Sequence, residues 1–303
     1  PRTDHDIRRA LERQIEAERW TQLDRQLLRD ARDAGAIDLA PHPDRQPDEY
    51  QALKIGRLRK LELLGLAEQV GPGQWSISHD AEATLRQLGE RGDIIKRMHR
   101  ALTEKGIERG AAGYVLAAES VDAPVIGRLV ELDDELKGTA YAVVDGVDGR
   151  THHVKLRDLD AAGDSAPGSI VELRSFDDAR GQRRVAIAVR SDLDLQGQIS
   201  ASGATWLDRQ AVARERIDVS SGGFGAEVRE AMDRRAERLL QEGLAERQGR
   251  RIVFNRNLID TLRRRELDAL GGKLATETGL PFNRAAGGDY VSGTYRQRLA
   301  LAS

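Results

Sequence analysis

The spacing of apolar residues changes twice along this chain of 303 residues, and that change constrains the fold more than any other feature. Up to about residue 115 the apolar side chains recur every three or four residues, as on one face of a helix. From about residue 116 to residue 200 they follow the period of two that is typical of β-strands, and helical spacing returns after Thr205. The pattern therefore predicts an α+β protein with several domains.

A helix followed by a β-hairpin is predicted in the first part of the chain. A leucine-rich helix begins at Asp48 and ends at Gly65, because glycine readily adopts the left-handed conformation of a helix cap. Residues 66–78 then form two short strands around a Gly-Pro-Gly turn. Thr21 fits the N-cap of an earlier helix, with Asp24 three residues further on. We interpret residues 1–115 as a helical, winged-helix-like unit.

The middle of the chain is predicted to be a small β-barrel. Five short segments have strand-like alternation, and Asp145-Gly146 and Asp148-Gly149 supply the positive φ that a hairpin turn requires. Short strands without long helices between them are typical of a closed barrel. We place this barrel over residues 116–200.

The helical part after the strands repeats four residues of the first part. Gly243-Leu244-Ala245-Glu246 follows a leucine-containing helix and precedes a glycine turn and a strand, as Gly65-Leu66-Ala67-Glu68 does. We interpret residues 201–257 as a second winged-helix-like unit, so that two such units flank the barrel. Residues 258–303 are predicted to form a C-terminal helical tail.

The residue types that most metal and nucleophile chemistry needs are absent or scattered. The sequence has no cysteine and six histidines, of which His152 and His153 are adjacent and should point to opposite faces of a strand, one inward and one outward. Residues 220–225 could cradle a phosphate at a helix start, but the missing Gly-Lys-Ser/Thr ending favours a flexible linker with a helix cap. We predict no catalytic residue, no metal site and no cofactor in this chain.

The sequence also bears on location. No apolar run approaches the roughly 18–20 residues that a membrane span requires, and the start of the sequence has no basic-then-apolar leader. We therefore expect no membrane insertion and a cytoplasmic protein. The first residue is Pro1 rather than methionine, which indicates a fragment or a processed chain.

Arginine dominates the basic residues, and the net charge is positive only toward the end of the chain. Residues 209–303 carry 18 basic and 13 acidic side chains, whereas residues 116–208 carry 10 and 17. Guanidinium groups suit bidentate contact with phosphate, and the low aromatic content of 4% favours duplex or backbone contact over stacking of single-stranded bases. We expect the outward arginines of the two helix–hairpin units and a hairpin tip to contact DNA. The candidates are Arg59, Gln74, Trp75, Arg234, Arg238, Arg250 and Arg251.

Pairing with carboxylates is the alternative for these basic residues. Glu230 is placed to pair with Arg234 at i,i+4 spacing, which would make that part of the helix an ordinary solvated face. Lys54 and Arg57 fall inside the apolar arc of their helix, so they must extend to solvent or find a partner.

Several longer runs resemble the C-terminal region of bacterial relaxase/mobilisation nucleases from conjugative plasmids. The resemblance covers nearly the whole chain and is carried by these residues, in order: Gly56-Arg57-Leu58-Arg59-Lys60-Leu61, 65–68, 71–75, Gly89-Glu90-Arg91-Gly92-Asp93-Ile94-Ile95-Lys96-Arg97, 139–146, 202–208 and Gly293-Thr294-Tyr295-Arg296. It implies a DNA-nicking enzyme whose catalytic tyrosine and metal-binding histidines belong to an N-terminal nuclease domain. No residue of this chain matches those catalytic positions.

The resemblance implies an accessory role. We expect this region to bind and orient plasmid transfer-origin DNA beside a nuclease domain that this chain does not contain. The alternative is a protein-interaction module that presents the relaxase to a coupling protein of type IV secretion machinery, because an acidic middle region would repel DNA and suit a basic partner.

Overall fold

The computed structural model describes residues 4–34, 37–40, 50–116, 124–135, 138–284, 290, 292 and 294. The chain divides into two compact units, Pro1–Lys96 and Arg97–Ser303, which we call unit 1 and unit 2. Together they form a mixed α+β protein, in which the described residues provide eight α-helices and three sheets. None of the described helices combines the length and the apolar character needed to cross a membrane.

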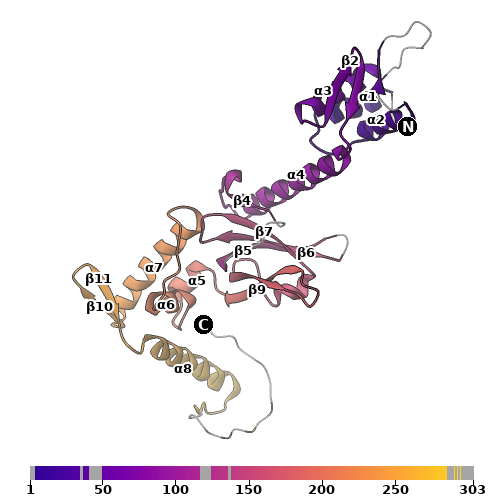
Figure 1. Ribbon diagram of the computed structural model, residues 1–303. Coiled ribbons are helices and arrows are strands. Elements are labelled where there is room, and N and C mark those ends of the chain that lie inside the picture. Colours follow the sequence, from indigo (N-terminus) through magenta and orange to yellow (C-terminus); the bar gives the residue numbers. More distant parts are fainter. Residues whose placement is uncertain are drawn as a thin grey trace. The chain divides into compact units, whose positions relative to one another are not determined.

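Unit 1 consists of helices packed on a small antiparallel sheet (Figure 1). The sheet has the order β1-β3-β2, and its core includes Leu27, Leu58, Leu61 and Leu85. The predicted helix starting at Asp48 is present from Gln51, and residues 41–49 lie outside the described residues. The elements are α1 (Asp4–Ile15), α2 (Gln22–Ala34), β1 (Ile37–Asp38), α3 (Gln51–Leu63), β2 (Ala67–Gly71), β3 (Gln74–Ile77) and α4 (Ala81–Glu104), the last of which contains the boundary between the units.

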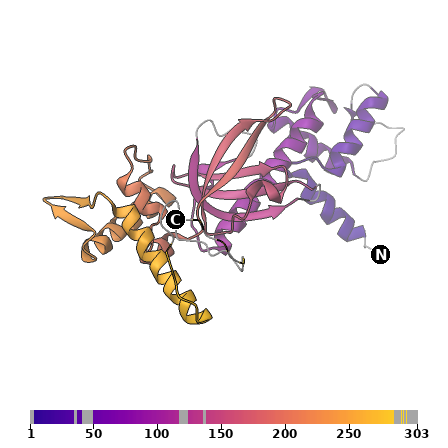
Figure 2. The same cartoon turned by 90° about the horizontal axis from the view of Figure 1, so that it is seen from below.

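Unit 2 contains a six-stranded sheet with the order β4-β7-β6-β5-β8-β9. Its strands are the magenta and pink arrows in Figure 2. All neighbours are antiparallel except β4 and β7. The elements are a 3-10 turn (Ala111–Gly113), β4 (Tyr114–Val115), β5 (Val125–Asp134), β6 (Ala140–Gly146), β7 (Thr151–Leu156), a second 3-10 turn (Leu159–Ala162), β8 (Ile170–Asp177) and β9 (Arg183–Ser191).

The predicted closed barrel is not present among the described strands. The sheet curls enough to bring Cα atoms of β7 and β9 within 8 Å, yet these strands do not pair, and β4 and β9 remain its edges. The concave side holds an apolar core that includes Leu129, Val144, Val154 and Val171. A curled, open sheet thus takes the place of the barrel.

Helices and a second hairpin complete unit 2. Helix α7 packs on α5, α6 and β6, and its core partners include Val147, Trp206, Phe224 and Val228. The predicted helical tail is present as α8, while most residues after 284 lie outside the described part. The elements are α5 (Leu195–Ser200), α6 (Trp206–Val212), α7 (Gly223–Gln241), β10 (Ala245–Gln248), β11 (Arg251–Phe254) and α8 (Leu258–Thr278).

The two adjacent histidines are both buried, which corrects the expectation of one outward imidazole. His152 and His153 lie on opposite faces of β7, but both faces are covered by other parts of unit 2. His152 Nε2 lies 2.9 Å from Asp148 Oδ2, and His153 stacks on Tyr141 with ring centroids 5.2 Å apart. Burial and the nearby Arg97 charge lower the pKa of His153 to about 4, so it is neutral at physiological pH.

Candidate nucleic-acid interface

A buried arginine anchors the helix that precedes each hairpin. In unit 1, Arg57 of α3 donates from Nε and Nη2 to the two carboxylate oxygens of Asp24 at 2.7 and 2.9 Å. In unit 2, Arg235 of α7 makes the same bidentate pair with Asp208, with both distances 2.8 Å. Each arginine side chain is at most 3% exposed, so of the two alternatives predicted for Arg57 it finds a partner inside the unit and does not extend to solvent.

The remaining donors of each arginine hold the chain segment before the preceding helix. Arg57 donates to the carbonyl oxygens of Ile15, Ala17 and Arg19, at 2.6–3.0 Å. Arg235 donates to the carbonyl oxygens of the equivalent residues, Ile199, Ala201 and Gly203. Carbonyl groups that a helix end leaves unpaired are thereby satisfied inside the protein.

The two aspartates also cap helices. Asp24 accepts from the backbone N–H of Thr21 at 2.7 Å, and Asp208 accepts from that of Thr205 at 2.8 Å. In return each threonine hydroxyl oxygen accepts from the backbone N–H of its aspartate, completing a capping box in α6 and the same contacts at the start of α2. The predicted cap at Thr21 is confirmed.

These matched contacts reveal a repeat much longer than the four residues first recognised. The pattern Gln-Ile-x-Ala-x3-Thr-x-Leu-Asp-Arg-Gln occurs at residues 14–26 and again at residues 198–210. Gly65 and Gly243, which end the following helices, share a φ of +72°. This signal is present in the sequence, upstream of the four residues that begin at Gly65 and at Gly243. We call the two repeated parts copy 1 (residues 14–77) and copy 2 (residues 198–254).

Three predicted phosphate contacts lie close in sequence on exposed parts of copy 2. Arg234 is exposed on α7, Arg250 lies in the turn between β10 and β11, and Arg251 begins β11. Within the described part of the chain, none of the three makes an ion pair. Their guanidinium groups are therefore free to meet a polyanion.

Arg238 differs from these three because a carboxylate already holds it. Its Nε donates to Glu242 at 2.9 Å, and Glu242 also receives Arg265 at 3.2 Å. Binding a phosphate through Arg238 would compete with this pair. Arg256, just after β11, is exposed and was missed, although it belongs to the same short basic stretch of sequence.

The candidates in copy 1 do not form an equivalent surface. Arg59 is exposed on α3 and Gln74 is exposed at the start of β3, but Trp75 is only 3% exposed and packs in the core of unit 1. The expectation that Trp75 forms a hairpin tip is wrong, because successive residues of a strand face opposite sides and Gln74 takes the outward one. Its hairpin has no basic residue between positions 66 and 78.

Ion pairs hold α7 against the sheet within unit 2. The buried Asp145 of β6 receives Arg109 at 2.8 Å and Arg128 at 2.9 Å, and Arg128 also donates to Glu227 of α7 at 3.0 Å. The Arg128 guanidinium also lies 4.8 Å from the centre of the Phe224 ring. Arg109 and Arg128 therefore stabilise the packing of α7 on the sheet.

The loop at residues 220–225 is also structural. A Cβ on Gly225 would lie 2.6 Å from the backbone nitrogen of Ser220 and even closer to the carbonyl oxygen of Val147. Arg229 Nη2 caps the loop by donating to the carbonyl oxygens of Val219 and Ser220, at 3.0 and 3.2 Å. Close backbone packing accounts for the glycine without a phosphate.

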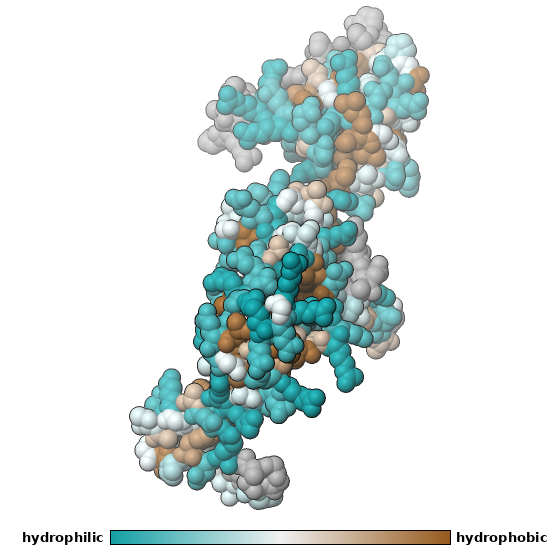
Figure 3. All heavy atoms as spheres, turned by 90° about the vertical axis from the view of Figure 1, so that its left-hand side faces the viewer, coloured by the Kyte–Doolittle hydropathy of each residue, from teal (hydrophilic) through white to brown (hydrophobic). Residues whose placement is uncertain are grey.

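The described side chains contain no cluster of three or more potential metal ligands. Hydrophilic side chains cover most of the face shown in Figure 3, with smaller hydrophobic areas between them.

Comparison of this chain with known proteins identifies the family to which it belongs. No curated protein and no solved structure matches the chain significantly. One family, described as "Protein of unknown function (DUF3363)", matches residues 54–180 and residues 173–303, well over half of the sequence. The chain therefore belongs to the DUF3363 family.

Proposed function

We propose that this chain binds DNA through copy 2 and orients it beside a nicking nuclease domain of a conjugative relaxase. The observation that carries the proposal is that three arginines on α7 and the hairpin after it, Arg234, Arg250 and Arg251, are exposed and form no ion pair within the described structure. In this proposal each copy is a winged-helix-like unit, with α3 or α7 as the helix before the wing and the following hairpin as the wing. The relaxase context rests on the sequence resemblance described above.

The contrast between the copies supports this assignment. Residues 245–254 of copy 2 carry three arginines and one glutamate, and of these arginines Arg247 pairs with Glu237, whereas the only charged residue in the hairpin of copy 1 is Glu68. The two copies share the buried clamp, so folding does not require the extra arginines. Positive charge placed on a hairpin without a structural partner is suited to phosphate contact.

Orientation of the hairpin is also secured. Leu244 and Ala245 pack in a core with Leu239 and Leu258, so β10 and β11 are tied to both α7 and α8. Arg250 and Arg251 therefore extend from a supported hairpin. A fixed pair of cations loses less conformational freedom on binding than a pair on a loose loop.

The test is a salt series of DNA affinities for the full chain. Fluorescence anisotropy with duplex and single-stranded oligonucleotides gives the slope of log affinity against log salt. Replacing Arg250 and Arg251 by alanine should reduce the magnitude of that slope by about 0.9 per lost phosphate contact on duplex and about 0.7 on a single strand. Replacing Arg234 should reduce it on duplex, where no base is unstacked and its guanidinium meets a phosphate. Circular dichroism confirms that the variant remains folded.

Arg183→Ala is the matched control, because Arg183 is exposed at the start of β9 in unit 2 and lies outside copy 2. It should leave the slope unchanged. An equal effect of Arg183→Ala and the copy 2 substitutions, or no binding to any DNA at low salt, would refute the proposal. In the second case, capture of a coupling protein would favour the interaction-module alternative.

A further inference from the structure

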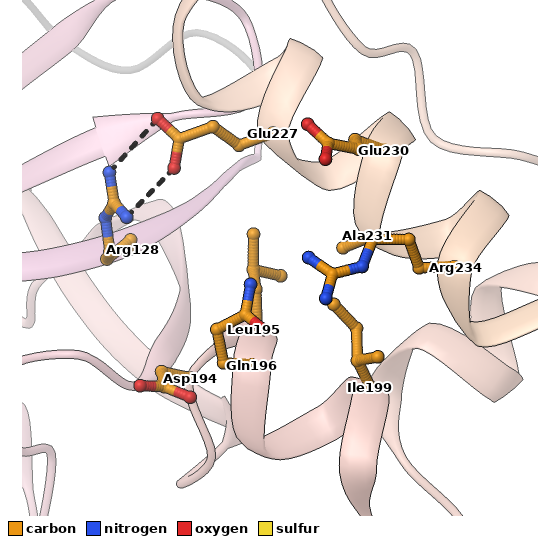
Figure 4. Close-up of a pocket in the computed structure, with 9 residues that line it drawn as sticks. All are labelled: Arg128, Asp194, Leu195, Gln196, Ile199, Glu227, Glu230, Ala231 and Arg234. Atoms are coloured by element: carbon orange, nitrogen blue, oxygen red, sulfur yellow. Dashed lines mark hydrogen bonds and ion pairs between the residues drawn. The ribbon is translucent and has the colours of Figure 1, made fainter. Parts of the chain in front are cut away.

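A pocket of about 210 Å³ lies beside Arg234 in unit 2 (Figure 4). Helices α5 and α7 and strand β5 supply its walls. The lining residues are Arg128, Asp194, Leu195, Gln196, Ile199, Glu227, Glu230, Ala231 and Arg234. Pockets for drug-sized ligands usually hold about 300–1,000 Å³, so this one suits a single small ring system.

Two of its charged groups are free while the others are already used. Arg128 and Glu227 bind each other, and Asp194 accepts from the backbone N–H of Gly197 at 2.7 Å. Arg234 and Glu230 form no ion pair in the described structure, so the predicted i,i+4 pair is not formed. Figure 4 shows both side chains projecting toward the pocket, where Leu195 and Ile199 give apolar surface.

Copy 1 has no space for a pocket at the position equivalent to Arg234. Gly56 precedes the buried Arg57 as Arg234 precedes Arg235, and Ile15 is the counterpart of Ile199. A Cβ on Gly56 would lie 3.4 Å from two carbon atoms of the Ile15 side chain, so Ile15 packs directly on this helix. The guanidinium at the pocket is therefore a feature of copy 2 alone.

We propose that this pocket receives one unstacked guanine base from a DNA strand whose phosphates contact Arg250 and Arg251. The inference rests on the proposed function and names the base that the pocket beside Arg234 selects. Guanine presents two neighbouring N–H donors, N1–H and N2–H, which one carboxylate can accept together. Its O6 and N7 atoms accept the paired donors of an arginine.

The free groups of the pocket match those two edges. Glu230 supplies the acceptor, and Arg234 supplies the donors. Leu195, Ile199 and Ala231 give apolar contact to the ring, so recognition does not depend on the aromatic stacking for which this chain has few residues. Thymine offers one N–H donor, and a carboxylate therefore discriminates against it.

The test compares single-stranded oligonucleotides that differ at one base. Thymidine 12-mers with a central dG, dA, dC or dT are titrated against the full chain by fluorescence anisotropy. We expect the dG oligonucleotide to bind about 10-fold more tightly than the all-dT one, because a good bidentate base contact discriminates by about that factor. Glu230→Gln should abolish this preference without weakening binding of the all-dT strand.

Asp233→Asn is the matched control, because it removes the same charge from an exposed position of α7 that does not line the pocket. It should keep the preference for dG. If both variants simply raise the affinity for every oligonucleotide alike, Glu230 acts only as a repelling charge and the inference is refuted. Equal binding of all four oligonucleotides by the unmodified chain would refute it too, while leaving the phosphate contacts of the proposed function intact.

A second measurement does not depend on the hairpin arginines. Titration of dGMP and dTMP, followed by NMR of the arginine side chains, should give saturable binding of dGMP and a loss of that binding in Glu230→Gln. Absence of dGMP binding at millimolar concentration overturns the inference. This result does not depend on whether the chain binds oligonucleotides, so it tests the pocket separately from the proposed function.

Discussion

Replacing Asp208 by asparagine should destabilise unit 2 strongly, because it leaves a buried guanidinium without its counter-ion. Arg235 is 3% exposed at its side chain and Asp208 is fully buried, with both charge-assisted hydrogen bonds at 2.8 Å. Removing one partner of such a pair typically costs about 3–5 kcal/mol. The new amide would also place N–H donors against the donors of Arg235.

The expected loss of unfolding free energy can be measured as a shift of the melting temperature, Tm. For a unit of 150–250 residues each kcal/mol shifts Tm by about 2–4 °C, so Asp208→Asn should lower the Tm of unit 2 by about 6 °C or more. Urea unfolding followed by hydrogen-exchange mass spectrometry assigns the loss to one unit. Peptides from α6 and α7 should lose protection at lower urea, while those from α2 and α3 should be unaffected.

Copy 1 provides an internal replicate. Asp24→Asn should destabilise unit 1 in the same way and leave unit 2 unaffected, because Arg57 is fully buried and makes the same contacts. The control is Glu237→Gln, whose pair with Arg247 is about half exposed and should contribute at most about 1 kcal/mol. If Asp208→Asn destabilises no more than Glu237→Gln, the buried pair does not anchor α7 and the reasoning about both clamps fails.

Two further predictions concern unit 2. The pKa of His153 is lowered to about 4 in the fold, against about 6.5 when unfolded, so below pH 6.5 the unfolded chain gains a proton that the fold rejects. The free energy of unfolding should fall by about 3 kcal/mol between pH 6.5 and 4. Urea titrations at several pH values should show that His153→Phe lacks this fall. If the free energy of unfolding changes with pH equally in the variant and the unmodified chain, the assignment to His153 is wrong. Gly225→Ala should destabilise by about 1–3 kcal/mol because its Cβ meets backbone atoms, whereas Gly222→Ala, with nothing within 4 Å, should change the urea midpoint little, and similar midpoints would contradict the packing argument.

Local patterns were sufficient to predict the hairpins and their positions. Gly65 and Gly243 end α3 and α7 in the left-handed conformation, as glycine permits. The alternation of period two predicted a sheet, and the sheet is present. These features depend on residues that are neighbours in sequence.

Long-range pairing was harder to predict. Closure of a barrel requires the first and last strands to meet in register, and no local pattern reports whether they do. The same limit applied to Arg57, which was predicted to extend to solvent or find a partner, because its partner, Asp24, lies 33 residues away. Trp75 was a different failure, since the alternation of β3 already placed it on the inner face.

The two copies also separate what folding requires from what binding requires. Residues common to both, including the threonine, aspartate and arginine of each clamp, are buried and hydrogen-bonded to one another. Residues that differ include Gly56 against Arg234 at the pocket and an uncharged turn against Arg250 at the hairpin tip. Because both copies form the same helix and hairpin, exposed residues that differ between them are not needed to specify that fold. It is therefore on copy 2, at the positions where copy 1 has no cation, that substitutions should change DNA affinity without changing stability.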